Sequence, residues 1–322
     1  MLSSPEPAAL LVGAAATRGE ALRAAERITV ATGSRLLCET FPARLERGAG
    51  VPVAQRLAYL PEQVREQLAG TRHLVLAGAR SPVSFFGYQE QPGDLVPEGC
   101  VVHELTGPGV DVASALAELS ALLREPNSAA PRSATVTRGS PLGELTLSSL
   151  GAALAMVLPA GAIVSDEAIT ASAGLAATTA AAAPHDWLSI TGGAIGQGIP
   201  VATGAAIACP DRPVISLQAD GSAVYTISAL WTQAREGLDV TTVLLSNRSY
   251  AILAMELGRL DIGEPGALTR DLLDLSRPEL DFVSLARGFG VPGERPETVE
   301  EFTAALHRAL SEPGPHLIEV RL

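Results

Sequence analysis

The sequence contains no lysine, and all 23 of its cationic side chains at neutral pH are arginine. Schiff-base catalysis and Walker-type phosphate binding both require a lysine, so neither chemistry is available. Positive charge is also outnumbered, because 35 acidic residues give a formal net charge of −12. Nucleic-acid binding draws most of its affinity from clustered cations. We therefore expect no nucleic-acid partner.

Cysteines are few and widely spaced: Cys38, Cys100 and Cys209 form no CxxC pair. This spacing predicts neither a zinc site nor a disulfide framework, and it favours a cytoplasmic location. The most apolar long stretch, Leu147–Val164, is interrupted by Ser148, Ser149, Pro159 and Gly161, which is typical of a buried helix turning into a strand and not of a membrane span. Met1–Pro7 has no basic region before its apolar stretch, so it does not indicate a secretory signal.

A length of 322 residues, 47% of them hydrophobic, favours two domains. The first half alternates short apolar runs with amphipathic segments, which predicts an α/β domain with a small parallel sheet over residues 1–125. Strands are expected at Ala9–Gly13, Arg35–Cys38, His73–Gly78 and Val101–Leu105, and helices near Arg18–Ala31, Glu62–Leu68 and Val112–Leu123.

Residues 126–141 are polar, carry three prolines and show no periodicity, so they predict a linker. The remaining residues, 142–322, again alternate strands and helices, and the fold class expected for the chain is α/β with two three-layer, parallel-sheet domains. Strands are expected at Ala162–Ser165, Val214–Gln218, Val240–Leu245 and His316–Arg321, and helices after Gly143, over Ala223–Glu236 and from a capping box at Thr298.

The most informative segment is Asp220-Gly221-Ser222, at the end of a hydrophobic strand, followed by Asn247. The 25 residues between Gly221 and Asn247 (222 to 246) suffice for one helix and one strand. Asp220 and Asn247 should therefore emerge at the carboxyl ends of neighbouring parallel strands, where open α/β sheets bind ligands. Their oxygens suit Mg²⁺, which commonly binds phosphate oxygens as well as protein ligands. A helix beginning near Ser222 would direct backbone N–H groups at the same phosphate. The alternative is an ordinary turn with Asp220 as a helix cap.

The same segment resembles the thiamine diphosphate motif, Gly-Asp-Gly followed downstream by Asn, with Ala219 in place of the first glycine. The stretch from Asp220 through Gly-Ser-Ala-Val-Tyr-Thr-Ile-Ser-Ala-Leu-Trp-Thr-Gln-Ala is similar to benzoylformate decarboxylase. Gly192–Pro200 resembles the segment that contacts the cofactor's aminopyrimidine, and Glu39-Thr-Phe-Pro-Ala-Arg resembles the family's middle domain. The chain is identified as a member of the thiamine diphosphate-dependent acetolactate synthase (large subunit) and benzoylformate decarboxylase family.

The resemblance implies two cofactors, thiamine diphosphate and Mg²⁺, and assigns residues to both. Mg²⁺ would be bound by the side chains of Asp220 and Asn247 and by the backbone carbonyl of Ser249. The diphosphate would contact Gly221, Ser222 and Tyr250, the aminopyrimidine would meet the carbonyl of Gly193 and the wedge side chain Ile195, and Thr170 is a weaker phosphate candidate that suits an ordinary turn equally well. No catalytic side chain is assigned within the chain.

In the family, a glutamate that activates the cofactor lies in an N-terminal pyrimidine-binding domain, which this sequence is expected to lack. Glu144 and Glu167 are interpreted as structural. The chain alone should then be inactive and should work with a pyrimidine-binding domain or subunit, as part of a homo-oligomer. An exposed apolar face is expected near Ile195 and Tyr250. A separate gene, a truncated reading frame or a cut protein would each account for the missing domain.

The expected substrate is a small 2-oxo acid, and the reaction type stays open. Residues 171–183 lack the Gln-His-Gln-Met-Trp stretch of acetolactate synthases, and 248–255 lack a tryptophan. An acetolactate synthase-like enzyme, a benzoylformate decarboxylase-like enzyme and a noncatalytic cofactor-binding subunit therefore all remain. A nicotinamide site at the glycines 193–198 is disfavoured, because no free acidic residue follows at the required position. His185 is expected to be a loop histidine.

Overall fold

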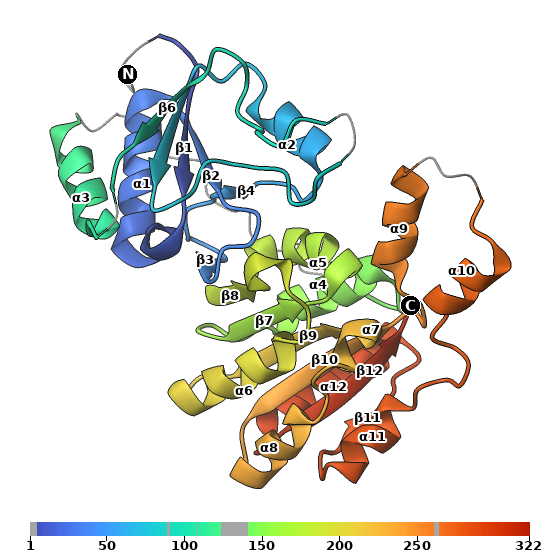
Figure 1. The fold of residues 1–322 in the computed structure, drawn as a ribbon. Coiled ribbons are helices and arrows are strands. Elements are labelled where there is room, and N and C mark those ends of the chain that lie inside the picture. Colours follow the sequence, from blue (N-terminus) through green and yellow to red (C-terminus); the bar gives the residue numbers. More distant parts are fainter. Residues whose placement is uncertain (1–4, 89–90, 108, 124–140, 261–263) are drawn as a thin grey trace. The chain divides into compact units, whose positions relative to one another are not determined.

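The computed structural model describes residues 5–88, 91–107, 109–123, 141–260 and 264–322 (Figure 1). The chain divides into two compact units, residues 1–133 and 134–322. This division point falls within the predicted linker, 126–141, which lies outside the described residues except for position 141. None of the helices in the described part of the chain has the length and apolarity needed to cross a bilayer.

The first unit is built around a parallel sheet with the strand order β4-β2-β1-β5-β6. Its strands are β1 (Ala8–Val12), β2 (Arg35–Cys38), β4 (Gln55–Arg56), β5 (His73–Ala77) and β6 (Val101–Glu104), and a short strand β3 spans Leu45–Arg47. Its helices are η1 (Ala14–Thr17), α1 (Gly19–Thr32), α2 (Pro61–Leu68) and α3 (Val112–Leu122). The predicted parallel α/β pattern of the first half is therefore present.

Both faces of this sheet are covered, which explains why its central strands are continuously apolar. Successive side chains of a strand point to opposite faces. Leu10 of β1 packs with Ile28 of α1 and Leu116 of α3. Its neighbour Leu11 packs on the other face with Leu68 of α2. The unit is thus a three-layer α/β structure, with α1 and α3 on one side and α2 on the other.

The second unit contains a larger parallel sheet, in which its strands follow the order β11-β12-β10-β9-β7-β8. The strands are β7 (Ile163–Glu167), β8 (His185–Ser189), β9 (Val214–Ala219), β10 (Val240–Ser246), β11 (Gly293–Glu294) and β12 (His316–Arg321). The helices are α4 (Leu147–Val157), η2 (Ile169–Ala171), α5 (Ser172–Thr178), η3 (Thr179–Ala181), η4 (Thr191–Gly193), α6 (Gly198–Ala208), α7 (Asp220–Ala223), α8 (Ala229–Glu236), α9 (Ala251–Arg259), α10 (Ala267–Leu273), α11 (Phe282–Gly288) and α12 (Val299–Ser311).

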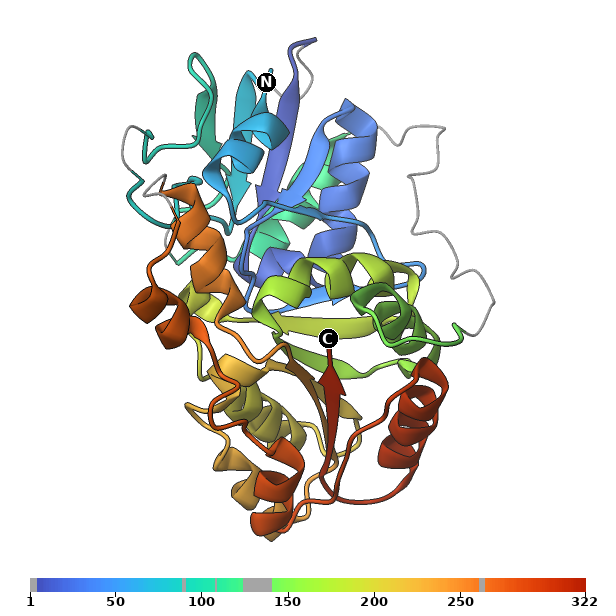
Figure 2. The ribbon, with the colours of Figure 1, turned by 90° about the vertical axis from the view of Figure 1, so that its right-hand side faces the viewer.

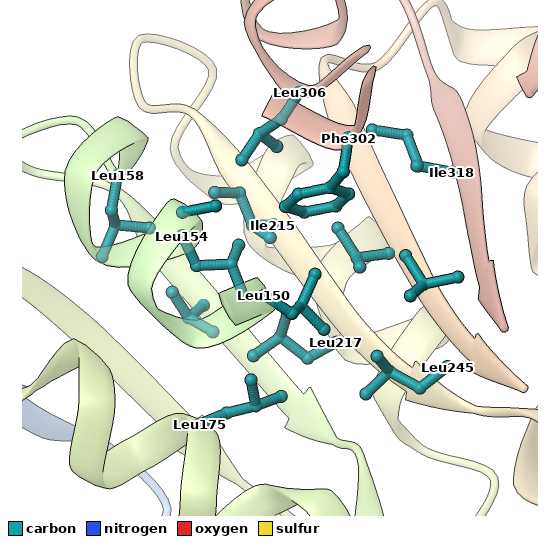
Figure 3. Close-up of a cluster of buried hydrophobic side chains, with 14 of the residues drawn as sticks. Leu150, Leu154, Leu158, Leu175, Ile215, Leu217, Leu245, Phe302, Leu306 and Ile318 are labelled. Atoms are coloured by element: carbon teal, nitrogen blue, oxygen red, sulfur yellow. The ribbon is translucent and has the colours of Figure 1, made fainter. Parts of the chain in front are cut away.

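Helices cover both faces of this sheet as well (Figure 2). On one face, Leu150 of α4 and Phe302 of α12 pack against Leu217 of β9 in the largest buried cluster of the described residues (Figure 3). On the other face, α6, α8 and α11 contribute Ile199, Leu230 and Phe282. The expected fold class, α/β with three-layer parallel sheets, is confirmed.

Two local expectations were wrong. The helix predicted over 223–236 is replaced by the single turn α7 and the separate helix α8. The turns between them are closed by i to i+3 bonds such as Thr226 N–H to the Ala223 carbonyl, at 3.1 Å, in a stretch rich in β-branched residues, which disfavour helix. His185, expected in a loop, is the buried first residue of β8. A buried strand needs apolar neighbours on both faces, and Pro184-His185-Asp186 gave no such pattern.

Candidate functional site

The order of the strands places a crevice at one edge of the second sheet. β8 lies on one side of β7 and β9 on the other, so the connections that follow β7 and β9 leave toward opposite edges. In open parallel sheets, ligands bind at the carboxyl ends of the strands at such a point. Asp220 directly follows β9, and Asn247 directly follows the neighbouring strand β10. The two predicted metal ligands therefore emerge side by side at this edge.

Asp220 is a buried carboxylate held by backbone groups. It is only 3% exposed. Its Oδ1 accepts the N–H of Gly221 at 2.8 Å, while its Oδ2 accepts the N–H of Arg248 at 2.7 Å and the hydroxyl of Ser246 at 3.3 Å. Burial raises the pKa of Asp220, and these hydrogen bonds act in the opposite direction. Within the described residues no cationic side chain pairs with it, so a bound cation would supply the missing positive charge.

The loop after β10 carries the other predicted ligands. The Oδ1 of Asn247 accepts the N–H of Ser249 at 3.0 Å, which folds the loop back on itself. Arg248, between them, has a left-handed backbone with φ of 56°. The carbonyl of Arg248 and the N–H of Tyr250 both bond to segment 273–275, at 2.9 Å each. The loop is therefore fastened by backbone bonds to the end of α10 and to the residues that follow it.

Gly221, Ser222 and Tyr250, the predicted diphosphate contacts, lie next to one another. Gly221 packs so closely against Tyr250 that a Cβ at position 221 would lie 2.7 Å from the ring carbon Cε1. The hydroxyl of Ser222 accepts a hydrogen bond from Gln218 at 2.7 Å and donates to the carbonyl of Ala219 at 3.2 Å. Glycine is thus required at position 221 by the close approach of the loop.

A pocket of about 230 Å³ opens at the same edge, and Thr170, Ala219 and Asn247 line it together. Thr170 lies in η2, which follows β7 after the single residue Ala168, and it is exposed. The structure thus brings this weaker candidate to the same pocket as Asn247, one of the predicted metal ligands. Its neighbour Ile169 adopts a left-handed backbone with φ of 53°, an uncommon conformation for a β-branched residue.

The glycine-rich segment reaches this edge from the connection between β8 and α6. Gly193 ends η4, and Ile195 is 43% exposed. The segment is held by Glu167, the last residue of β7, whose carboxylate accepts successive backbone N–H groups of residues 196–198. Glu167 also accepts a bond from Gln218 of β9 at 3.0 Å. Sequence reasoning left both of these anchors without a role in the site. Their signal was a long polar side chain at, or one residue before, the carboxyl end of a strand.

The donor set fits a magnesium ion that shares its coordination with phosphate oxygens. Among the described residues no group of three or more His, Cys, Asp or Glu side chains could hold a metal by itself. The predicted ligands are instead the carboxylate of Asp220, the amide oxygen of Asn247 and the backbone carbonyl of Ser249. Mg²⁺ prefers such hard oxygen ligands, usually binds few protein carboxylates, and fills its octahedron with waters and substrate phosphates.

Comparisons with known proteins agree with this geometry. Residues 169–320 match the family model "Thiamine pyrophosphate enzyme, C-terminal TPP binding domain". The chain is 55% identical over 323 aligned positions to the "Putative acetolactate synthase large subunit IlvX" of Mycobacterium tuberculosis, covering 99% of this chain and 62% of that protein. It is 32% identical to the benzoylformate decarboxylase of Pseudomonas aeruginosa, covering 79% of this chain and 49% of that protein.

A solved structure extends the similarity to three dimensions. The thiamine diphosphate-dependent 4-hydroxybenzoylformate decarboxylase of Rhodococcus jostii RHA1 matches with a TM-score of 0.78 and 27% identity, covering 99% of this chain and 62% of that protein. The chain thus spans less than two thirds of the length of these relatives. It belongs to the family of thiamine diphosphate-dependent enzymes that includes acetolactate synthases and benzoylformate decarboxylases.

Proposed function

We propose that the second unit binds thiamine diphosphate together with Mg²⁺ at the carboxyl edge of its sheet. The observation that carries the proposal is Asp220, a buried carboxylate that no cationic side chain of the described residues pairs with. It is held beside Asn247 at the switch point of a parallel sheet. Asp220 and Asn247 would bind the metal through side-chain oxygens, and Ser249 through its carbonyl. Gly221, Ser222 and Tyr250 would contact the diphosphate, with Thr170 as a further contact from η2.

The glycine-rich segment would hold the organic part of the cofactor. Gly193 would accept a hydrogen bond from the aminopyrimidine at its carbonyl, and Ile195 would support the bent cofactor from below. The exposed side chain of Ile195 is available for such a contact. Thiamine diphosphate, when bound, supplies the electron sink that lets a 2-oxo acid lose CO₂. The residues of this chain would bind the cofactor and orient it.

The proposed substrate is a small 2-oxo acid, and the proposed activity is of the acetolactate synthase large-subunit kind. The 55% identity to the "Putative acetolactate synthase large subunit IlvX" of Mycobacterium tuberculosis supports this choice. A second candidate is a 2-oxo acid decarboxylase of the benzoylformate type, which is favoured by the solved 4-hydroxybenzoylformate decarboxylase with the same fold. The two candidates differ in the fate of the decarboxylated product, which is joined to a second 2-oxo acid or released as an aldehyde.

A pyrimidine-binding domain or subunit is the proposed partner, within a homo-oligomer. Three apolar side chains near the glycine segment and the diphosphate turn are exposed to solvent in this chain: Ile195 at 43%, Val224 at 48% and Tyr225 at 65%. Apolar side chains gathered at a ligand site commonly mark a surface that another domain covers. The chain alone would bind the cofactor without turning over substrate. Its three cysteines are all free, which suits a cytoplasmic location.

Isothermal titration of thiamine diphosphate into the chain, with and without Mg²⁺, tests the cofactor proposal. Binding should require Mg²⁺ and should be lost in Asp220→Ala. Pyruvate and benzoylformate turnover should be absent from the chain alone and should appear when a pyrimidine-binding domain of a relative is added. Binding that ignores Mg²⁺ or survives Asp220→Ala would contradict the proposed site. Continued inactivity beside an added domain would favour a noncatalytic cofactor-binding subunit.

A further inference from the structure

Glu167 is a buried carboxylate at the centre of four hydrogen bonds. It ends β7 and is 0% exposed. Its Oε1 accepts the N–H of Gly196 at 2.8 Å and the side-chain amide of Gln218 at 3.0 Å. Its Oε2 accepts the N–H of Gln197 at 2.8 Å and that of Gly198 at 2.5 Å. In the described part of the chain no arginine or histidine pairs with Glu167, so N–H dipoles alone stabilise its charge.

Three of these donors are consecutive backbone N–H groups that lead into α6: Gly196 precedes the helix, Gln197 is its N-cap and Gly198 its first residue. The first backbone N–H groups of a helix have no partner within the helix. A negative charge is favoured at this end by the helix dipole. Helices are usually capped by a Ser, Thr, Asp or Asn of their own chain segment. Here the capping group is the Glu167 carboxylate, which comes from the neighbouring strand β7 and accepts the N–H groups of the three residues directly after Ile195. The position of Ile195 is therefore tied to the end of β7.

A second contact links Glu167 to the diphosphate turn. Gln218 lies directly opposite Glu167 in the register of β7 and β9. Its amide nitrogen donates to Glu167 and, at 2.7 Å, to the hydroxyl of Ser222. A Cβ at Gly198 would lie 2.6 Å from the Gln218 Oε1 and 2.7 Å from the Glu167 Cβ. The glycine segment, β7 and the turn after β9 are thus in close contact.

We infer that Glu167 is a positioning residue that joins the two halves of the cofactor site into one unit. The inference rests on the proposed function, in which the diphosphate binds at the turn Asp220–Ser222 and the aminopyrimidine binds at Gly193 and Ile195. Glu167 touches neither half of the cofactor. It fixes the distance between the glycine segment and the turn, so that a cofactor anchored by its diphosphate can also contact Ile195 and Gly193.

The test compares two ligands on the full chain with Mg²⁺ present: inorganic diphosphate, which reports the turn alone, and thiamine diphosphate, which also reports the glycine segment. In Glu167→Gln one amide oxygen faces four donors, so the glycine segment loses its anchor. We expect the Kd of diphosphate to change less than about twofold and that of thiamine diphosphate to rise about tenfold or more, as befits a buried charged hydrogen bond. Amide hydrogen exchange at residues 196–198 should also accelerate selectively.

Asp166→Asn is the matched control. Asp166 is the neighbouring buried carboxylate, and it accepts the indole N–H of Trp187 at 3.0 Å and the hydroxyl of Ser172 at 2.7 Å, away from the glycine segment. This variant should lower the melting temperature without changing the ratio of the two Kd values. If Glu167→Gln does not fold, Gly198→Ala replaces it, because the added Cβ pushes the segment away from an intact carboxylate and should produce the same selective loss.

The outcomes separate the inference from the proposed function. Equal weakening of both ligands by Glu167→Gln, or no change in either, would show that Glu167 is only a helix cap. If the native chain binds thiamine diphosphate no more tightly than diphosphate, the glycine segment does not hold the cofactor and the inference fails while the diphosphate site stands. If the native chain binds neither ligand, the proposed function itself fails.

Discussion

The carboxylate of Asp220 accepts the backbone N–H of Arg248 at 2.7 Å, so the end of β9 is fastened to the loop that follows β10. The bond reaches the residue directly after Asn247. The two proposed metal ligands are therefore held near one another by the protein's own hydrogen bonds. A site arranged before its ligand arrives loses less conformational entropy when the ligand binds. The cost is a buried charge, which is reflected in the raised pKa of Asp220.

Asp220→Asn separates the binding role of the Asp220 carboxylate from the cost of burying its charge. The amide keeps an acceptor oxygen for one backbone N–H group and removes the buried negative charge. Without Mg²⁺ we expect the melting temperature to stay level or rise, because the penalty for burying the charge is gone. Mg²⁺ with diphosphate should raise the melting temperature of the native chain and leave that of the variant unchanged, because only a ligand that binds the folded chain stabilises it. Residues that merely hydrogen-bond to metal ligands are worth about 10–100-fold in metal affinity, and a direct ligand should matter at least as much.

Differential scanning fluorimetry over a series of Mg²⁺ concentrations provides the measurement. Ser228→Ala, an exposed residue beside α8, serves as a control and should keep the native Mg²⁺ response. A variant that loses stability in the absence of Mg²⁺ yet keeps the full response to Mg²⁺ would show that Asp220 is a structural turn residue and not a metal ligand.

The placement of Asp220 and Asn247 followed from the sequence because their spacing matches one helix plus one strand between neighbouring parallel strands. Glu167 and Gln218 were not assigned to the site. Their hydrogen bonds depend on the register of β7 against β9 and on a segment from another connection, and neither follows from local sequence. The strand β8 was missed for the same reason: Trp187 is buried by tertiary contacts, including a bond to Asp166.

The close packing of Gly221 on Tyr250 predicts the effect of Gly221→Ala. The new Cβ would meet the ring at 2.7 Å, and the ring must move before the turn can close. We expect a loss of about 1–3 kcal/mol in the free energy of unfolding, as for other overpacked sites. Urea denaturation measures this loss.

Removing the ring should relieve the clash, so Gly221→Ala combined with Tyr250→Leu should cost less than the sum of the two single changes. Strictly additive losses would show that the ring does not restrict position 221. Thiamine diphosphate binding should be weakened in both single variants, because each alters a proposed diphosphate contact.

Gly151 lies in α4, at a position where we expect alanine to lower the stability of the chain. Alanine is normally favoured over glycine within a helix by about 1 kcal/mol. At position 151, however, a Cβ would lie 2.1 Å from the hydroxyl oxygen of Thr178 and 2.9 Å from its Cβ. The clash should outweigh the propensity, and Gly151→Ala should destabilise the chain by about 1–3 kcal/mol in urea denaturation.

Gly204 of α6 is the matched control for Gly151. It is also a helical glycine, but a Cβ there would meet nothing within 4 Å. Gly204→Ala should therefore stabilise the chain by about 0.4–1 kcal/mol. Equal effects of the same sign at both positions would contradict the packing of α4 against the segment that carries Thr178.

Cys38, the last residue of β2, should react with alkylating reagents only after the chain unfolds. It is fully buried, and burial raises its pKa to about 12. Because the thiolate is the reactive form, iodoacetamide at about pH 8 should modify the partly exposed Cys100 and Cys209 and spare Cys38 in the folded chain. Mass spectrometry of the alkylated chain measures this selectivity. Alkylation of Cys38 at the same rate as Cys209 would show that the core between β2 and α1 opens readily.

The raised pKa of Cys38 also predicts how stability depends on pH. An unfolded chain releases the thiol proton near its ordinary pKa of about 9, whereas the folded chain keeps it, so stability should fall as the pH rises from about 9 toward about 12. Urea denaturation of the native chain and of Cys38→Ala across this pH range measures this fall.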